Sequence, residues 1–254
     1  MEPSKRRNFI LDQLENEGKV TIDELSVELD VSMMTIRRDL DQLESEGRVI
    51  RVHGGAVLPR PLISETSFLE KEIRKVDQKR QIVKKAFSYI QEGQTLILDS
   101  GTTTLELAKL LKHSKNITII TNDIKIASEL LESNLKVIVT GGELQNDIGA
   151  LFGSWTQHFL KDIHVDIFFL GAHAVDLQAG VTSPTHEKSS IKQLMIQAAE
   201  NTWLLADSSK LNHKSFAKVC RLEELTGFIT DNDISDYEKS RYSESVDLMI
   251  VSSG

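Results

Sequence analysis

The sequence is poor in cysteine, proline and long apolar runs, and these shortages exclude several classes of protein. A single cysteine, Cys220, excludes an internal disulfide and a site of clustered thiolates, and it fits a reducing compartment. No segment approaches the roughly 18 consecutive apolar residues of a membrane span, and no apolar run follows the basic start of the chain. We therefore expect a soluble, unprocessed, cytoplasmic protein without a membrane partner.

The chain also lacks an excess of positive charge. Its 30 Lys and Arg against 38 Asp and Glu give a net charge of -8, which disfavours a protein that coats polyanions but permits local basic patches. At roughly 150 residues per domain, 254 residues correspond to one large domain or two smaller ones.

Prolines mark where the chain divides. Pro59 and Pro61, two of only four, separate a helical first part from a longer mixed part. We assign residues 1–58 to one domain, 59–91 to a linker and connecting helix, and 92–254 to a second domain. The connecting region, about residues 68–90, is read as one helix or two. Its candidate buried positions are Ile73, Val76, Ile82, Val83, Ala86 and Phe87.

After residue 92, short β-branched runs alternate with helical stretches. Strands are predicted at LILD, ITII, LKVIV, DIFFL, WLLA, GFIT and DLMIV, and helices at LELAKLL, IKIASELL and IKQLMIQAA. Strand, helix and strand in succession are typical of a parallel sheet. The fold class of this domain is therefore α/β.

Residues 1–58 predict three helices and a hairpin. The first helix ends before Gly18, a capping box at Thr21 to Glu24 starts the second, and Ser32 caps the third. The sequence GRVIRVHGGAVL alternates like two strands, and glycines at positions 54 and 55 permit the positive φ of a tight turn. Three helices followed by a hairpin indicate a winged helix-turn-helix.

The third helix has one apolar and one polar face. Ile36, Leu40 and Leu43 share the buried stripe, Met34 and Arg38 point outward, and Thr35 and Arg37 flank them. Such a surface suits a DNA major groove. The alternative is that the two arginines are an ordinary solvated pair and the glycines an ordinary turn.

A longer pattern favours DNA binding. VSMMTIRRDLDQLESEGRVIRVHGGA resembles the amino-terminal signature of the DeoR family of bacterial transcriptional regulators. The resemblance implies that Thr35, Arg37 and Arg38 contact DNA, and that Ser32 caps the helix and contacts phosphate. Either arginine could recognise a guanine base. The candidate DNA-binding residues are Ser32, Met34, Thr35, Arg37, Arg38, Arg51, His53 and Gly54.

In the second domain, the loop after the first strand suits an anion. Ser100-Gly101-Thr102-Thr103-Thr104 leads directly into a helix, whose first amides carry partial positive charge, and the threonines add hydroxyl donors. The alternative is an ordinary capped turn. The chain has no GxxxxGKS or GxxxxGKT loop and no GxGxxG, so nucleoside triphosphate and dinucleotide sites lose support.

Other polar residues follow apolar runs and should gather at the same edge of a parallel sheet. Lys210 would neutralise a phosphate, and Asn122 and Asp99 would bond sugar hydroxyls. The histidines are too irregularly spaced for a metal motif, so we expect neither metal nor cofactor. The candidate effector-binding residues are Asp99, Ser100, Gly101, Thr102, Thr103, Thr104, Thr121, Asn122, Gly141, Gly142 and Lys210.

This half is similar to the DeoR-type sensor domain, through DSGTTT, DIFFLGA, GVTSP and ADSSK, and that domain resembles ribose-5-phosphate isomerase in fold. The resemblance implies a phosphorylated sugar as effector. Two departures from the family pattern, Ala174 in place of a glycine and Lys188 in place of an acid, put the identity of this ligand in question.

Two functions remain open. The first is a transcriptional regulator, which we expect to repress a carbohydrate-utilisation operon and to leave operator DNA when a phosphorylated sugar binds. We expect it to act as a homo-oligomer, either a dimer or a tetramer. An activator would share every site. The second is a sugar-phosphate isomerase-like enzyme fused to a DNA-binding segment, with Asp99, Asp166, Asp207 and Lys210 as acids and bases. No carboxylate pair stands beside a clear nucleophile, so we expect no enzyme.

Overall fold

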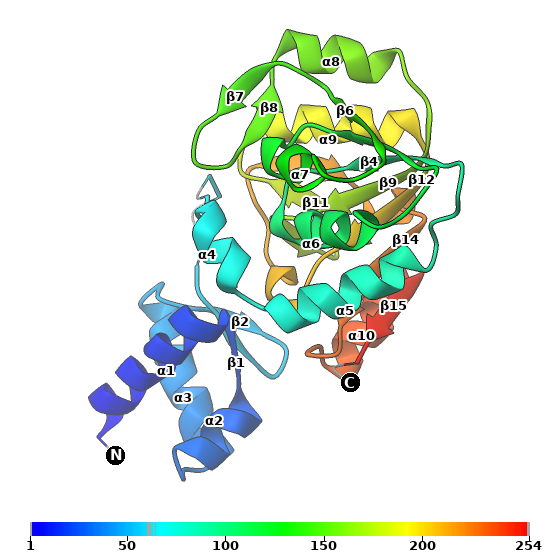
Figure 1. Cartoon of the computed structure of the whole chain (residues 1–254). Helices are drawn as coiled ribbons and strands as arrows, with labels where there is room; N and C mark the ends of the chain where they lie inside the picture. The colour runs from blue at the N-terminus through cyan, green and yellow to red at the C-terminus, as the bar shows by residue number, and fades with distance from the viewer. Residues whose placement is uncertain (1, 60–61, 64, 253–254) are drawn as a thin grey trace. The chain divides into compact units, whose positions relative to one another are not determined.

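The computed structural model describes residues 2–59, 62–63 and 65–252, and the chain divides into two compact units (Figure 1). The first unit is Met1–Pro61 and the second is Leu62–Gly254.

The first unit is a winged helix-turn-helix, as predicted. Its elements in order are α1 (Pro3–Glu17), β1 (Lys19–Thr21), α2 (Ile22–Glu28), α3 (Met33–Ser45), β2 (Ile50–Val52) and β3 (Gly55–Val57). The three strands form an antiparallel sheet in the order β1-β3-β2. β1 was not predicted, because three residues between two helices are too few to show strand alternation.

Side-chain caps start the second and third helices as the sequence indicated. The Thr21 hydroxyl accepts from the Glu24 amide at 3.2 Å and donates to the Glu24 carboxylate at 2.6 Å. The Ser32 hydroxyl accepts from the Thr35 amide at 3.2 Å. The predicted stripe Ile36, Leu40 and Leu43 is fully buried and packs with residues from α1 and α2.

The two glycines of the wing have different roles. Gly54 lies in the turn at a φ of 75°, a region that L side chains rarely adopt. Gly55 has no such φ, which corrects the prediction for that residue. A Cβ at position 55 would lie 1.9 Å from the Val20 carbonyl oxygen, because β3 is the central strand and passes close to β1. Close approach, rather than a turn conformation, requires Gly55.

A buried ion pair joins α1 to α3. The Arg6 guanidinium donates to both carboxylate oxygens of Asp39, through Nε and through Nη2 at 3.2 Å. Both residues are at most 7% exposed. Two parallel hydrogen bonds fix the direction of one helix against the other more firmly than apolar packing alone.

In the second unit, the connecting region forms two helices, α4 (Phe68–Ile73) and α5 (Val76–Phe87), with Lys75 at a φ of 51° between them. Ile82, Val83 and Ala86 are buried as predicted, and Val76 is half-buried. The prediction was wrong for Ile73 and Phe87, which are 77% and 39% exposed. The break at Lys75 interrupts the helical period, so Ile73 does not share a face with the buried residues of α5. Beyond α5 the aromatic contact is made by Tyr89 instead of Phe87, and its ring centroid lies 4.2 Å from that of Trp203.

All seven predicted strands form one parallel sheet. They are β4 (Thr95–Leu98), β5 (Thr118–Thr121), β6 (Lys136–Val139), β9 (Val165–Gly171), β12 (Ala199–Leu205), β14 (Gly227–Asp231) and β15 (Leu248–Val251). Their order is β15-β14-β12-β9-β4-β5-β6. From the neighbours β4 and β9 the chain therefore winds outward in opposite directions. This is the switch point at which open α/β sheets bind ligands.

Helices cover both faces of this sheet (Figure 1). The helices after the strands are α6 (Thr102–Leu111), α7 (Ile124–Glu129), α8 (Ser154–Lys161), α9 (His186–Ala198) and α10 (Asp236–Ser243). Leu96 and Leu98 belong to the apolar cluster that includes α5, α6 and α7, whereas Ile97 belongs to the cluster with α8, α9 and α10. Alternate residues of each strand thus supply two separate cores.

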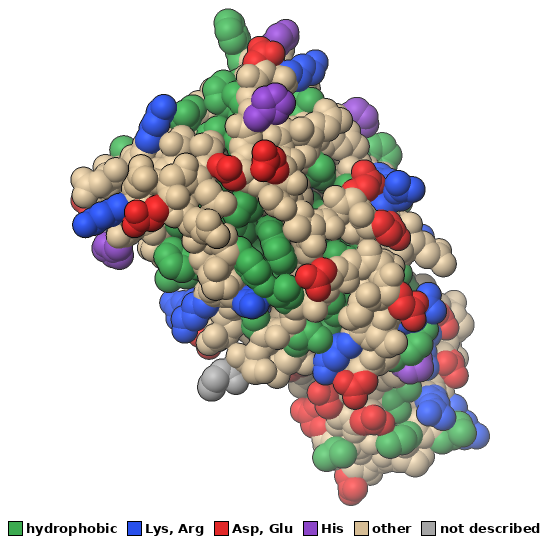
Figure 2. All heavy atoms as spheres, turned by 90° about the vertical axis from the view of Figure 1, so that its right-hand side faces the viewer, with side chains coloured by type: hydrophobic (Ala, Val, Ile, Leu, Met, Phe, Trp, Pro, Cys, Tyr) green, Lys and Arg blue, Asp and Glu red, His purple; other side chains and the backbone are tan. Residues whose placement is uncertain are grey.

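Short antiparallel pieces complete the unit, and none of them was predicted. β10 (Ala174–Asp176), β11 (Gly180–Ser183) and β13 (Ala217–Cys220) form a three-stranded sheet, and β7 (Glu143–Gln145) pairs with β8 (Ala150–Phe152). Two single 3₁₀ turns occupy Ser208–Lys210 and Leu222–Glu224. Basic and acidic side chains are interspersed over the face shown in Figure 2. Among the residues that the structure describes, no helix combines the length and the apolar character needed to cross a bilayer.

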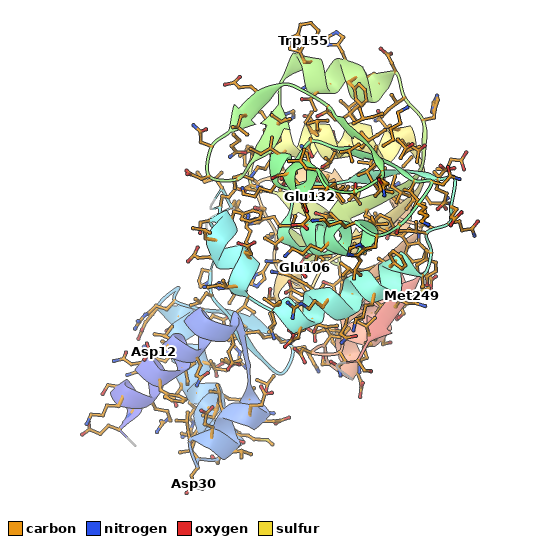
Figure 3. The ribbon with its side chains drawn as sticks, in the orientation of Figure 1. Asp12, Asp30, Glu106, Glu132, Trp155 and Met249 are labelled. Carbon is orange, nitrogen blue, oxygen red and sulfur yellow. The ribbon has the colours of Figure 1, made fainter. Side chains whose placement is uncertain are left out.

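Replacing Asp39 with alanine should destabilise the first unit by about 3 kcal/mol, because the buried Arg6 guanidinium would lose the Asp39 carboxylate that accepts two of its hydrogen bonds. Both tryptophans, Trp155 and Trp203, lie in the second unit, so their fluorescence does not report on the first. Amide hydrogen exchange in α1 and α3 should therefore rise while the tryptophan unfolding transition stays unchanged. Asp12→Ala, at an exposed position of α1 (Figure 3), is the control. Equal exchange in both variants would contradict a stabilising role for the pair.

Candidate functional site

The exposed face of α3 carries most of the residues predicted to meet DNA. Met34 is 55% exposed, and Arg37 and Arg38 are exposed beside it. Ser32 is exposed at the N-cap, and its hydroxyl lies 2.9 Å from that of the half-buried Thr35. The capping bond therefore holds both hydroxyls at the start of the helix. Two guanidinium groups, two hydroxyls and a thioether occupy one exposed surface.

The hairpin supplies the other three predicted residues. His53 and Gly54 are exposed at its turn. Arg51 is half-buried instead: its amide donates to the Glu44 carboxylate at 3.2 Å, and its guanidinium lies 3.7 Å from the Asp41 carboxylate. Because Glu44 and Asp41 belong to α3, Arg51 links the wing to this helix.

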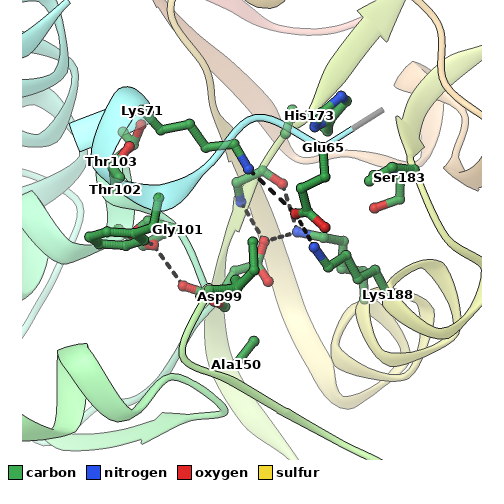
Figure 4. Close-up of a pocket in the computed structure, with 18 of the residues that line it drawn as sticks. Glu65, Lys71, Asp99, Gly101, Thr102, Thr103, Ala150, His173, Ser183 and Lys188 are labelled. Atoms are coloured by element: carbon green, nitrogen blue, oxygen red, sulfur yellow. Dashed lines mark hydrogen bonds and ion pairs between the residues drawn. The ribbon is translucent and has the colours of Figure 1, made fainter. Parts of the chain in front are cut away.

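A pocket opens in the second unit at the carboxyl ends of β4 and β9. Its volume is about 860 Å³, including the solvent-open mouth. Eleven residues were predicted to bind an effector, and eight of them line this pocket (Figure 4). They are Asp99, Ser100, Gly101, Thr102, Thr103, Thr104, Asn122 and Lys210.

The amino terminus of α6 faces this pocket without a side-chain cap. Gly101 occupies the N-cap position, so the first amides of the helix are left for another acceptor. Thr102 and Thr103 line the pocket, and within the described chain no hydrogen bond involves their hydroxyls. The Ser100 hydroxyl donates to Asp123 at 2.6 Å and that of Thr104 to the Asp99 carbonyl at 2.6 Å, so these two hold the loop.

Asp99 and Asn122 differ in how far their polar atoms are engaged. The Asp99 carboxylate, 2% exposed, accepts from the Gly171 amide at 2.9 Å and pairs with the Lys192 ammonium. Asn122 is 1% exposed and donates to the Leu151 carbonyl at 3.2 Å, but its side-chain oxygen has no partner among the described residues. A buried acceptor without a donor is costly, and a ligand hydroxyl would satisfy it.

Lysines gather in the pocket in excess over acids. Lys71, Lys79, Lys188, Lys192 and Lys210 line it, against Glu65 and Asp99. Burial, with the nearby charge of Lys210 among the further causes, lowers the pKa of both Lys71 and Lys79 to about 8. The pocket is therefore suited to an anion, which would restore full charge to these ammonium groups.

Sequence analysis did not assign four of these lysines to the effector site. Lys188 appeared there only as a departure from the family pattern. Lys71 and Lys79 belong to the charged connecting region, and nothing in their sequence context indicates a binding site, because a solvent-exposed helix would have the same composition.

Three predicted effector residues lie outside the pocket wall. The Thr121 hydroxyl is fully buried and donates to the Leu98 carbonyl at 2.8 Å, so it ties β5 to β4. Gly141 and Gly142 follow β6, and the Gly141 carbonyl accepts from Thr156 of α8 at 2.6 Å. Thr121 and Gly141 thus bond within the fold, and none of the three lines the pocket, so they are not part of the proposed site. In the described part of the chain, no group of three or more His, Cys, Asp or Glu could hold a metal ion.

Comparison with known proteins agrees with both units. Residues 6–61 match the DeoR-like helix-turn-helix domain, and residues 74–232 match the DeoR C-terminal sensor domain. The chain belongs to the DeoR family of transcriptional regulators. It is 35% identical to the HTH-type transcriptional regulator GlpR of Haloferax volcanii, over 99% of this chain and 98% of that protein. It is also 35% identical to the lactose phosphotransferase system repressor of Lactococcus lactis, over 98% and 99%.

Membership of the DeoR family confirms two expectations. This DeoR-family protein is a DNA-binding transcriptional regulator, and its full-length relatives are regulators rather than enzymes. Among solved structures, it is similar to ribose 5-phosphate isomerase of Methanocaldococcus jannaschii, with 17% identity, a TM-score of 0.41 and 54% of each chain covered.

Genomic fragments recovered with the intact regulator should include a few strong sites, and an Arg37→Ala, Arg38→Ala double variant should lose them. Each guanidinium that reads a base is worth about 1 to 3 kcal/mol of discrimination. A variant in which Arg241 and Arg221, both exposed in the second unit, are replaced by alanine removes the same charge and should retain the sites. An unchanged set of fragments in the α3 variant would show that neither arginine reads DNA sequence.

Proposed function

We propose that this regulator is a repressor of a carbohydrate-utilisation operon and that a phosphorylated sugar, bound in the pocket at β4 and β9, releases it from operator DNA. One observation carries the proposal. A single pocket contains the amino terminus of α6 without a side-chain cap, two threonine hydroxyls that bond to no described residue, and an excess of lysines.

The two ends of such a ligand have different requirements. A phosphate at the start of α6 would accept from its first amides and from the Thr102 and Thr103 hydroxyls, with Lys210 as counter-charge. The sugar would then extend over Asn122, whose buried oxygen accepts from a hydroxyl. Asp99 acts less directly, because Lys192 and the Gly171 amide already occupy its carboxylate.

DNA recognition is assigned to Ser32, Met34, Thr35, Arg37, Arg38, Arg51, His53 and Gly54. In this proposal residues 1–58 bind DNA, 59–91 connect, and 92–254 sense the ligand. A single recognition helix gives little specificity, so we propose a homo-oligomer, a dimer or tetramer, that places two such helices in successive major grooves about 34 Å apart. Release then requires a ligand that binds more tightly to a state in which the two recognition helices are spaced differently. The coupling free energy between ligand and DNA binding would be about 1 to 3 kcal/mol.

Affinity for inorganic phosphate should fall as the pH rises above about 8. The pKa values of Lys71 and Lys79 are lowered to about 8 chiefly by burial, so these ammonium groups lose their charge above that pH. Phosphate loses no negative charge as the pH rises, so a fall in affinity would come from the protein. Calorimetric titration of the full chain across this range should show proton uptake on binding. Constant affinity up to about pH 9.5 would show that the charge of these buried lysines does not strengthen phosphate binding.

Thr103→Phe should abolish release by a sugar phosphate while DNA binding is retained, because the larger ring would fill the space in front of the first amides of α6. Release of a recovered operator fragment is measured by fluorescence anisotropy while fructose 6-phosphate, glucose 6-phosphate or fructose 1,6-bisphosphate is added. Leu110→Phe, on the exposed side of the same helix, is the control and should respond normally. If Thr103→Phe also responds normally, the loop is only structural.

A further inference from the structure

Glu65 places a carboxylate inside the proposed ligand pocket. It lies on the short segment between the first unit and α4, and its side chain is 20% exposed. The carboxylate pairs with the Lys188 ammonium, lies 3.4 Å from the Lys71 ammonium and accepts from Gln145 at 3.5 Å. Figure 4 shows it between the two lysines. Three donors from three different elements thus converge on one anionic group.

These donors form a site separate from the start of α6. Lys188 lies in the first turn of α9, Lys71 in α4 and Gln145 in β7, whereas the phosphate position of the proposed function uses α6 and Lys210. Lys192 is already paired with Asp99. The cations at Glu65 are therefore not needed to neutralise a group at α6, and they would hold a second one.

One carboxylate balances the two ammonium groups incompletely. Burial lowers the pKa of Lys188 and of Lys71, and in each case a neighbouring lysine lowers it further. The same lysines lower the pKa of Glu65 against the effect of its own burial. A group with more negative charge than a carboxylate, or with better access to both lysines, would be bound here more strongly.

We propose that Lys188 and Lys71 form a second anion subsite, which the Glu65 carboxylate fills in the absence of ligand, and that the effector carries two anionic groups. This inference rests on the proposed function. One group binds at the start of α6, and the other displaces Glu65. A sugar bisphosphate and a phosphorylated sugar acid both meet this requirement, because the shared feature is a second anionic group remote from the phosphate.

Displacement of Glu65 also gives the ligand a route to the DNA-binding unit. Glu65 lies only four residues after Pro61, where the first unit ends. A sugar with one phosphate leaves the carboxylate bound and the segment held. A ligand with two anionic groups releases Glu65 from both lysines, while the Leu62 carbonyl still accepts from Ser215 at 2.6 Å and from Phe216 at 3.0 Å. Such a ligand has the differential affinity for two states that allosteric release requires.

The test compares ligands that differ in the second anionic group. Fructose 6-phosphate is paired with fructose 1,6-bisphosphate, and glucose 6-phosphate with 6-phosphogluconate, and each is titrated calorimetrically into the full chain. In at least one pair the ligand with two groups should bind about tenfold more tightly, the effect of one additional charge-assisted contact. The pair that shows the preference distinguishes a second phosphate from a carboxylate.

Variants locate the preference. Glu65→Gln should raise the affinity ratio within that pair, because the competing carboxylate is gone, and Lys188→Gln should lower the ratio to about 1. Lys188→Arg, which keeps the charge, should retain a preference and excludes misfolding as the cause. Glu132→Gln and Lys112→Gln change an ion pair outside the pocket and should leave the ratio unchanged.

The outcomes separate this inference from the proposed function. If one-phosphate sugars bind and the ratio is about 1 in every pair, or is the same in wild type, Glu65→Gln and Lys188→Gln, the second subsite is wrong and the sugar-phosphate site stands. If no phosphorylated sugar binds at all, the proposed function fails and the subsite fails with it.

Discussion

The bond between Asp99 and Gly171 joins the two strand ends at which the pocket of this regulator opens. Asp99 follows β4 and Gly171 ends β9, and these are the neighbouring strands from which the chain winds in opposite directions. The buried carboxylate accepts from the Gly171 amide and pairs with Lys192, which itself donates to the Gly171 carbonyl at 2.9 Å. These bonds join the carboxyl ends of β4 and β9 just before the loops that follow the two strands diverge. The start of α6 and the lysines of α4 and α9 face the opening that results.

Burial gives this opening its chemistry. In water the lysines would be fully solvated and would attract an anion only weakly, but Lys79 is 3% and Lys188 8% exposed. Charges removed from water interact more strongly with a ligand and with one another. Glu65 and Asp99 partly neutralise the lysines of the pocket through ion pairs with Lys71, Lys188 and Lys192. The Asp99 carboxylate also accepts from a backbone amide, whereas the Glu65 carboxylate accepts from none in the described part of the chain. Glu65 is therefore the more replaceable of the two carboxylates.

Elements with a strong periodic pattern could be predicted from the sequence. Leu96, Ile97 and Leu98 lie in a run long enough to indicate a strand, and Ile36, Leu40 and Leu43 recur at helical spacing, so local pattern and tertiary burial agree. The three-residue strands β7, β8 and β10 have no room for a pattern. Their pairing depends on the partner strand rather than on their own residues, as register depends on the neighbour in any antiparallel pair.

The pocket was predictable in part for the same reason. Residues directly after predicted strands, such as Asp99 and Asn122, could be assigned to one sheet edge because parallel strands end together. Thr121 was assigned by the same logic, but it is the last residue inside its strand, and its hydroxyl bonds back to β4. Lys71 and Glu65 reach the pocket from outside the sheet, through a segment whose path no local pattern specifies.

Three successive charged residues of α3 have different surroundings. Arg37, Arg38 and Asp39 are adjacent in sequence, but at 100° per residue they point in different directions. Asp39 turns inward and meets Arg6 of α1, while the two arginines stay exposed. The buried pair fixes the rotation of α3 about its own axis, and that rotation decides which side chains the helix presents. The placement of the exposed guanidinium groups therefore depends on a buried carboxylate of the same helix.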